Sequence, residues 1–144
     1  TFQTAELMVG PDGLPPDTLE LRDTCHVERL VRLPDTAPTP EVAGAALLGP
    51  WFCPDLQATA EITLEGAALI LWLRGDYSAR RRLCLTPLSD TAFSLADPGL
   101  PMGGRWVLTR DDEGKSRATR FTLNGLRTRH LAFERPTHFT SIAP

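Results

Sequence analysis

Cysteine is scarce in this 144-residue chain, and its distribution excludes the usual cysteine-based sites. The three cysteines, Cys25, Cys53 and Cys84, are far apart, and none has a cysteine or histidine neighbour at the spacing of zinc ligands. An odd number of widely spaced cysteines predicts neither a disulfide framework nor a metal centre. We therefore expect buried free thiols, no metal and no cofactor.

Long apolar runs and an excess of positive charge are also missing. The longest apolar run, residues 66–73, is far shorter than the roughly 20 residues that a membrane helix needs. The formal net charge of -3 provides no broad basic field, so we expect neither nucleic acid nor membrane as a partner. No leader pattern opens the chain and its first residue is Thr1 rather than Met, which leaves the compartment and any upstream portion open.

The most regular pattern in the chain lies within residues 49–73. Leu56, Ala58, Ala60, Ile62 and Leu64 alternate with polar residues, which predicts a strand with one buried face. After a turn at Glu65-Gly66, residues 68–73 are apolar on both faces, as in a strand covered on both sides. This stretch predicts an antiparallel hairpin.

Residues 1–44 are less regular, and we interpret them as an irregular segment followed by a proline-rich linker. Short strands are expected at 5–9 and 19–21, and residues 25–33 fit either a strand, which we prefer, or a helix. The prolines between 34 and 40 predict an extended linker, because each fixes its own φ and restricts the residue before it.

Strand-like runs joined by turn residues fill residues 45–135, and residues 136–144 form a tail. The turn signals include Asn124-Gly125, a strong signal for a two-residue hairpin loop. Sequential hairpins predict an all-β fold, an eight-stranded antiparallel up-and-down meander barrel, with an open two-layer sandwich as the alternative. The expected strands are 46–52, 56–64, 67–73, 82–86, 91–96, 105–110, 117–123 and 127–134.

Residues 49–58, GPWFCPDLQA, resemble a motif that opens the C-terminal, lipocalin-like β-barrel of many serine β-lactamase-like hydrolases. D-aminopeptidases and relatives of penicillin-binding proteins belong to this group, whose motif is Gly, any, Tyr, any, Ser, any, Glu, Leu, any, Ala. Here Trp51, Cys53 and Asp55 stand in place of Tyr, Ser and Glu. The similarity covers residues 26–135, and its other landmarks are 85–88 (LTPL), Phe93, Arg110-Asp111, Gly114 and 131–135 (LAFER).

The resemblance implies a non-catalytic domain, and the residues independently agree. The parent hydrolases need a nucleophilic serine three residues before a lysine, because the hydroxyl is inert until a basic neighbour takes its proton. The only lysine is Lys115, and the residue three positions before it is Asp112. We expect no enzyme activity from this chain.

Two groups of residues are candidates for contact with a ligand or partner. Arg80, Arg81 and Arg82 could meet a carboxylate, the alternative being a solvated charge cluster. Leu100 and Met102 lie in the long connection 97–104. In D-aminopeptidases, which the chain resembles, such a loop reaches into the catalytic mouth; the alternative is a lid over the barrel core.

Trp51 is the candidate for a structural clasp at the closed end of the barrel. It resembles the first-strand tryptophan of lipocalin-like barrels, across which an arginine lies. Arg129 is our first choice for that arginine, with Arg127 and Arg135 as alternatives. A cation over an aromatic face contributes about 0.5 to 2 kcal/mol and creates no site.

The leading functional hypothesis is an accessory domain of a β-lactamase-like serine hydrolase. It would cover the active-site mouth, restrict substrates or mediate assembly, and its partner would be the catalytic domain of the parent hydrolase. A free-standing lipocalin-like binder of a small apolar ligand is the alternative, which an unfilled cavity of several hundred cubic ångströms would favour. A homodimer is a further partner left open.

Overall fold

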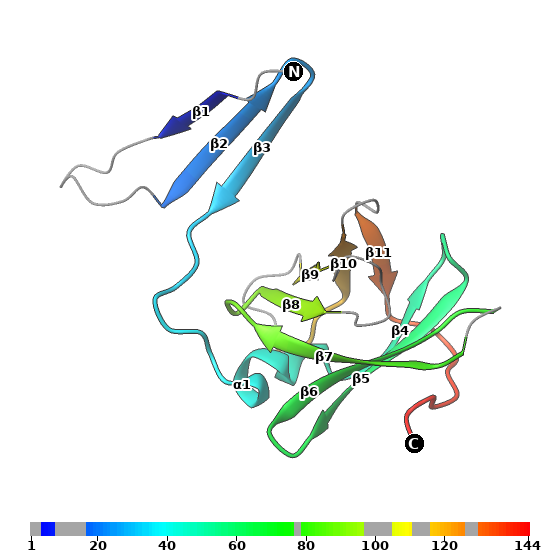
Figure 1. Ribbon diagram of the computed structural model, residues 1–144. Helices are drawn as coiled ribbons and strands as arrows, with labels where there is room; N and C mark the ends of the chain where they lie inside the picture. Colours follow the sequence, from blue (N-terminus) through cyan, green and yellow to red (C-terminus); the bar gives the residue numbers. More distant parts are fainter. Residues whose placement is uncertain (1–3, 8–16, 77–78, 97–104, 111–115, 126–129) are drawn as a thin grey trace. The chain divides into compact units, whose positions relative to one another are not determined.

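A computed structural model of the chain contains two units, residues 1–35 and residues 36–144 (Figure 1). The structure describes residues 4–7, 17–76, 79–96, 105–110, 116–125 and 130–144. Within these ranges no helix has the length and apolar character needed to cross a membrane. Each unit has its own sheet.

The N-terminal unit is a three-stranded antiparallel sheet rather than an irregular segment. Its strands are β1 (Thr4–Leu7), β2 (Thr18–Asp23) and β3 (His26–Val31), in the order β1-β2-β3. The strand interpretation of residues 25–33 is confirmed, because β3 pairs along its whole length with β2. Asp23 pairs with His26, so Thr24 and Cys25 form the tight turn between the two strands.

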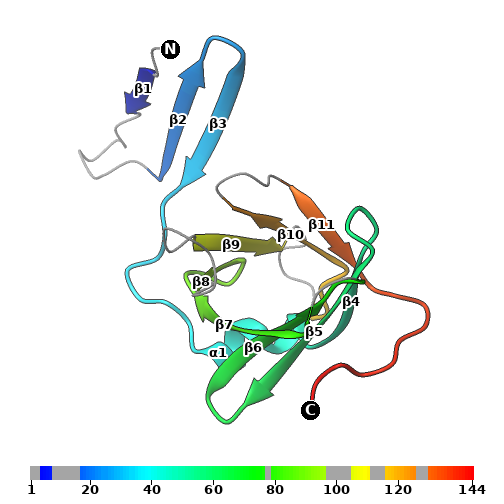
Figure 2. The same ribbon diagram turned by 45° about the vertical axis from the view of Figure 1, so that its right-hand side comes forward.

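The second unit is a closed eight-stranded antiparallel barrel with one short helix among the described residues (Figure 2), which confirms the predicted fold class. Sequential strands are neighbours throughout, and β11 returns to β4 to close the barrel. Its elements are α1 (Pro40–Gly44), the 3₁₀ turn η1 (Ala45–Leu47), β4 (Gly49–Cys53), β5 (Ala58–Glu65), β6 (Ala68–Arg74), β7 (Arg81–Pro87), β8 (Ala92–Ala96), β9 (Arg105–Arg110), β10 (Arg120–Asn124) and β11 (Leu131–Glu134).

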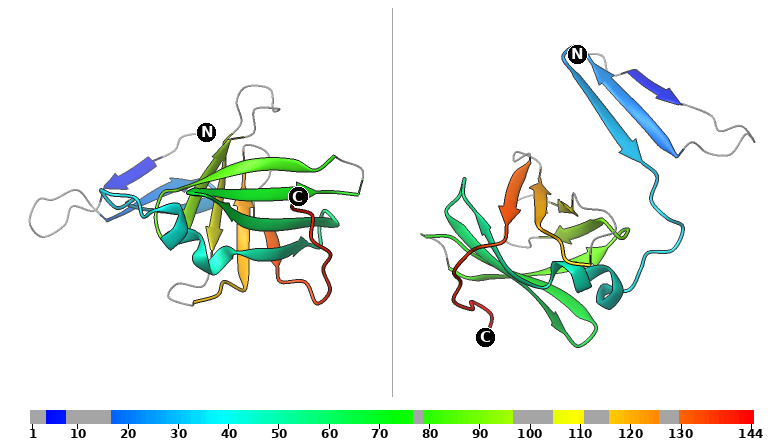
Figure 3. Two further views of the ribbon diagram at one scale, coloured as in Figure 1. Left: turned by 90° about the horizontal axis from the view of Figure 1, so that it is seen from below. Right: turned by 180° about the vertical axis from the view of Figure 1, so that it is seen from behind.

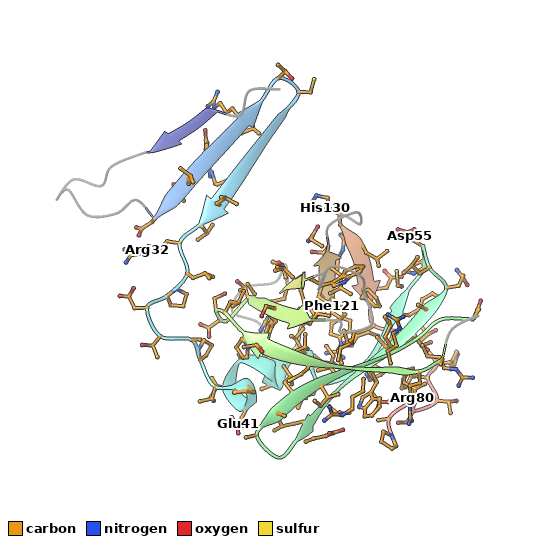
Figure 4. The ribbon with its side chains drawn as sticks, viewed as in Figure 1. Arg32, Glu41, Asp55, Arg80, Phe121 and His130 are labelled. Atoms are coloured by element: carbon orange, nitrogen blue, oxygen red, sulfur yellow. The ribbon has the colours of Figure 1, made fainter. Side chains whose placement is uncertain are left out.

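The barrel interior is filled by side chains. Phe121 stacks on Phe133 with a ring-centroid distance of 4.7 Å and an interplanar angle of 11°, and Trp51 meets Phe121 edge-on at 4.7 Å. Phe121 lies among the core side chains in Figure 4. The period-2 rule of a strand explains the inward set, and its prediction is confirmed for Ala58, Ala60, Ile62, Leu69, Leu71, Phe121, Leu123, Leu131 and Phe133.

Strand β6 is buried on both of its faces, as its uninterrupted apolar sequence predicts. Leu69 and Leu71 belong to the interior core, whereas Ile70 and Trp72 are buried outside it. The Trp72 indole donates a hydrogen bond to Thr63 Oγ1 at 3.1 Å. The outer face of β6 is therefore covered, and the indole N–H of Trp72 has a hydrogen-bond acceptor there.

Helix α1 and η1 occupy part of the expected linker and the expected start of the first barrel strand. Ala46 and Leu47 are buried in the core from η1, and β4 begins only at Gly49. The division between the units falls after Asp35, so α1 belongs to the barrel unit rather than to the segment before it. Pro40 suits the first helical turn, because an amide hydrogen has no partner within the helix there.

The predicted burial of two residues in the alternating run is wrong. Leu56 and Leu64 were expected on the buried face of β5, but they are 54% and 38% exposed. Both lie at the ends of the alternating run, where the barrel covers that face only in part. The period of a strand defines its faces but not the length over which a neighbour buries them.

The prediction of a two-residue hairpin loop at Asn124-Gly125 is also wrong. Leu123 pairs with Leu131, so the connection is longer than a tight hairpin, and the Asn124 side chain accepts a hydrogen bond from the His130 backbone at 2.8 Å. A Cβ on Gly125 would lie 2.9 Å from the Trp106 ring. The glycine is therefore explained by the close approach of Trp106.

Gly44→Ala should destabilise the barrel despite the better helix propensity of alanine. A Cβ at Gly44 would lie 2.5 Å from Leu69 Cδ1 and 2.8 Å from Cδ2, so buried atoms must move. We expect a loss of about 1 to 3 kcal/mol from overpacking, reduced by at most about 1 kcal/mol of helix propensity. Urea unfolding followed by tryptophan fluorescence measures it, and Leu69→Val in the same chain should recover part of the loss. An unchanged or raised midpoint for Gly44→Ala would contradict the tight contact.

Candidate functional site

The two ends of the barrel differ because alternate connections of a meander lie at the same end. The C-terminal ends of β4, β6, β8 and β10 lie at one end of the barrel, which we call the mouth. The β5–β6 connection lies at the other end, and Figure 3 shows α1 beside it. The contact of Gly44 with Leu69 places α1 against the core there.

A hollow of about 550 Å³ lies at the mouth. Leu73 and Trp106 are partly buried against the core beneath it, and the more exposed Leu56 is part of its wall. Charged groups of both signs surround this apolar surface, and Asp55 projects from the tip of the β4–β5 connection in Figure 4. The residues that line the hollow are Asp55, Leu56, Gln57, Ala58, Leu73, Gly75, Asp76, Arg81 and Trp106.

The arginine cluster Arg80, Arg81 and Arg82 is divided among different surroundings. Only Arg81 lines the mouth hollow. Arg80 and Arg82 lie over the Trp72 ring, with their guanidinium carbons 4.7 Å and 6.0 Å from its centroid. Arg82 also pairs with Glu65 at 2.7 Å, so these two arginines cover the outer face of β6.

Arg135 clasps the closed end of the barrel. Its guanidinium carbon lies 3.7 Å from the centroid of the Trp51 ring, and Trp51 Nε1 donates to the Leu47 carbonyl at 2.8 Å. Arg135 was one of three arginines considered for this position; Arg129, the first choice, and Arg127 lie outside the described residues. The Arg135 guanidinium also donates hydrogen bonds to backbone carbonyls of Ala46, Leu48, Pro50 and Ala118.

The tail, residues 136–144, is attached to the outer face of the barrel through Glu61 on β5. One carboxylate oxygen, Glu61 Oε2, accepts hydrogen bonds from the backbone N–H of Ile142 at 2.9 Å and of Ala143 at 3.0 Å. The Ser141 hydroxyl donates to the same oxygen at 2.8 Å. From the other side, Arg80 donates to the Ile142 carbonyl at 2.8 Å.

The Glu61 contact should make attachment of the tail dependent on pH. Partial burial alone would raise the pKa of Glu61, but the hydrogen bonds from Ala143, Ser141 and Ile142 outweigh it and hold the pKa below its usual value of 4.5. A lowered folded-state pKa stabilises the attached form above pH 4.5, and the stabilisation disappears as the pH falls through the lowered value.

The amide proton shifts of Ile142 and Ala143 measure this effect by NMR. We expect both to titrate with a midpoint below 4.5, and we expect Glu61→Gln to abolish that titration. Glu65→Gln is the matched control, because this glutamate at the end of the same strand pairs with Arg82 and should leave both titrations in place. A midpoint at or above 4.5 would contradict the contact.

The remaining predicted sites are distributed as follows. Leu100 and Met102 lie outside the described residues, as does Lys115. Cys53 is buried as expected and its burial raises the pKa of the thiol, but Cys25 and Cys84 are exposed. Cys84 alternates with the inward Leu83 and Leu85, so its place on β7 turns it outward. Across the described parts of the chain, no group of histidine, cysteine or acidic side chains could hold a metal ion.

The mouth hollow and the tail contact were not evident in the sequence. Asp55, Leu73 and Trp106 come together only because the barrel closes, and Glu61 is one of several polar residues on an outward strand face. The outward position of Glu61 could be predicted from the alternation in β5. Its contact with a segment about 80 residues later could not be predicted, since no local pattern encodes it.

The second unit is thus a closed up-and-down β-barrel with a filled interior and a hollow at its mouth. No protein-family model matches the chain, and no curated protein matches it either.

Proposed function

We propose that this chain contributes a non-catalytic accessory barrel to a β-lactamase-like serine hydrolase and contacts the catalytic domain through its mouth. The observation that carries the proposal is an apolar hollow above a filled core. Large side chains occupy the interior, so the barrel offers a partner its surface and its mouth rather than a deep cavity. The sequence resemblance across residues 26–135 supplies the class of the parent enzyme.

The mouth is suited to a protruding apolar side chain of a partner domain. Trp106 and Leu73 offer apolar surface at its base, and exposed Leu56 extends it to the rim. Asp55, Asp76 and Arg81 surround this surface with charges of both signs. An apolar centre with a polar rim is the usual organisation of a protein interface.

Leu56→Glu in the full-length product of the encoding gene tests the proposal. A carboxylate at the rim should lower kcat/KM for D-aminoacyl anilides at least about tenfold, because it puts an unpaired charge into an apolar contact. Leu64→Glu is the matched control, since Leu64 is also exposed but lies at the opposite end of β5. Equal activity of the two variants, or a full-length product without hydrolase activity, would reject the proposal.

The isolated chain provides a second test. It should not hydrolyse D-aminoacyl anilides, β-lactams or simple esters above background, because it lacks a serine three residues before its lysine. Stoichiometric labelling of a serine by a fluorophosphonate or penicillin probe would overturn this expectation.

The volume of the mouth hollow, about 550 Å³, favours a second candidate function, the binding of a small apolar ligand. A fluorescent fatty acid such as cis-parinaric acid distinguishes the two. If the chain is a ligand binder, the fatty acid should bind saturably at one-to-one stoichiometry, and Leu73→Glu should abolish this binding. If the chain is an accessory domain, no binding of the fatty acid is expected. Leu64→Glu again serves as the control for a charge outside the hollow.

A further inference from the structure

The contacts between the tail and the outer face of the barrel involve mainly backbone groups. We use the name backbone clamp for Glu61 and Arg80. Glu61 accepts two successive backbone N–H groups, those of Ile142 and Ala143, and Arg80 donates to the Ile142 carbonyl. Ser141 supplies the side-chain contact, through its hydroxyl. The clamp therefore contacts a backbone whose two successive N–H groups point to the same carboxylate oxygen, next to a residue with a hydroxyl group.

The barrel positions both members of the clamp independently of the tail. Glu61 lies on β5 between Ala60 and Ile62, whose side chains are fixed in the core. Arg80 lies over the buried Trp72 ring at 4.7 Å, a cation–π contact that holds its guanidinium near the outer face. Since both groups are held by the barrel, they would remain in place if the tail left.

We propose that the backbone clamp is a docking surface for a segment of a partner polypeptide, which it binds in place of the chain's own residues 138–144. The partner segment carries a serine or threonine followed by two residues with free backbone N–H groups. A carboxylate that faces paired N–H donors and a guanidinium that faces a carbonyl are complementary to a peptide backbone.

The chain's own tail is the internal competitor of that partner. Residues 135–144 contain no helix or strand, so the attached tail has no ladder of hydrogen bonds to lose when it leaves. Its connection to β11 gives it a high effective concentration, so it occupies the clamp until a partner segment competes. The inference concerns the outer face of β5 and β6 and does not depend on the function proposed for the mouth.

A variant of the full chain with a released tail tests the proposal. Ile142→Pro with Ala143→Pro removes both N–H donors to Glu61 and leaves the barrel sequence unchanged. The probe is a fluorescein-labelled peptide with the sequence of residues 138–144, HFTSIAP, and binding is measured by fluorescence anisotropy. Circular dichroism verifies the fold, and Ala143→Pro alone replaces the double variant if the latter does not fold.

We expect saturable binding of the peptide to the released-tail variant and at least about tenfold weaker binding to the wild-type chain, in which the tail competes. Adding Glu61→Gln to the released-tail variant should weaken binding at least about tenfold, because it removes the charge that accepts the N–H groups. Glu65→Gln is the control and should leave binding unchanged. No binding by the released-tail variant, equal binding by the wild-type chain, or equal binding after Glu61→Gln would each overturn the proposal.

Discussion

Replacing Arg135 by alanine should lower the free energy of unfolding by roughly 3 to 5 kcal/mol, which sums several charged hydrogen bonds and a cation–π contact at less than full additivity. The reason is its place at the closing seam of the barrel, where β11 and β4 share the single pair Glu134 and Phe52. The guanidinium lies over Trp51 and bridges this seam. Its acceptors are the carbonyls of Ala46 at 3.1 Å, Leu48 at 2.9 Å, Pro50 at 3.2 Å and Ala118 at 3.0 Å.

Urea unfolding of Arg135→Ala, followed by tryptophan fluorescence, measures this loss. Arg135→Lys should recover only part of it, because an ammonium group cannot serve acceptors in the planar arrangement of a guanidinium. Arg82→Ala is the matched control and should cost less than about 1 kcal/mol, since its ion pair with Glu65 is exposed. If Arg135→Ala and Arg82→Ala were equally stable, Arg135 would not be the clasp of the barrel.

Phe133→Ala should lower the free energy of unfolding by about 3 to 5 kcal/mol, the usual cost of removing a buried aromatic ring. Phe133 is fully buried, stacks on Phe121 at 4.7 Å and pairs with it across β10 and β11. Removing the ring leaves a cavity that is enclosed by the other side chains of a filled barrel, so the surroundings can relax only in part.

The same unfolding experiment measures Phe133→Ala, with Leu64→Ala as its control. Leu64 is an apolar residue of β5 that is 38% exposed, so its truncation should cost far less than that of Phe133. A loss under about 1 kcal/mol for Phe133→Ala would place the ring outside the packed core and contradict the inward assignment.

Alternation and turn residues were sufficient to predict the class of fold and most of the inward side chains. Ala58, Ala60 and Ile62 are buried at every second position, as their spacing predicts, because the side chains of a strand alternate between its faces. The alternation did not predict burial correctly at the ends of the run. Leu56 belongs to the same alternating run but lies at the mouth, where 54% of it is exposed.

At Gly125 the sequence pattern correctly indicates that a glycine is needed, but it assigns the wrong structural reason. Asn124-Gly125 is typical of a two-residue hairpin turn, yet the glycine is required where the Trp106 ring of β9 passes close to the backbone. Turn propensity reflects the backbone of a few successive residues. A close approach depends on a strand that lies elsewhere in the sequence, so a single window of sequence cannot reveal it.

The sequence by itself determined an all-β unit, the sequential pairing of its strands and the inward set around Phe121 and Phe133, because these follow from the period of a strand and from short connections. It left a closed barrel and an open two-layer sandwich as alternatives, and the tertiary structure decided for the barrel. Only the tertiary structure decided which arginine meets Trp51, which side chains form the mouth and that Glu61 holds Ile142 and Ala143. These contacts join residues that are far apart in the chain. They arise when the barrel closes, and closure depends on the packing of all eight strands rather than on any local pattern.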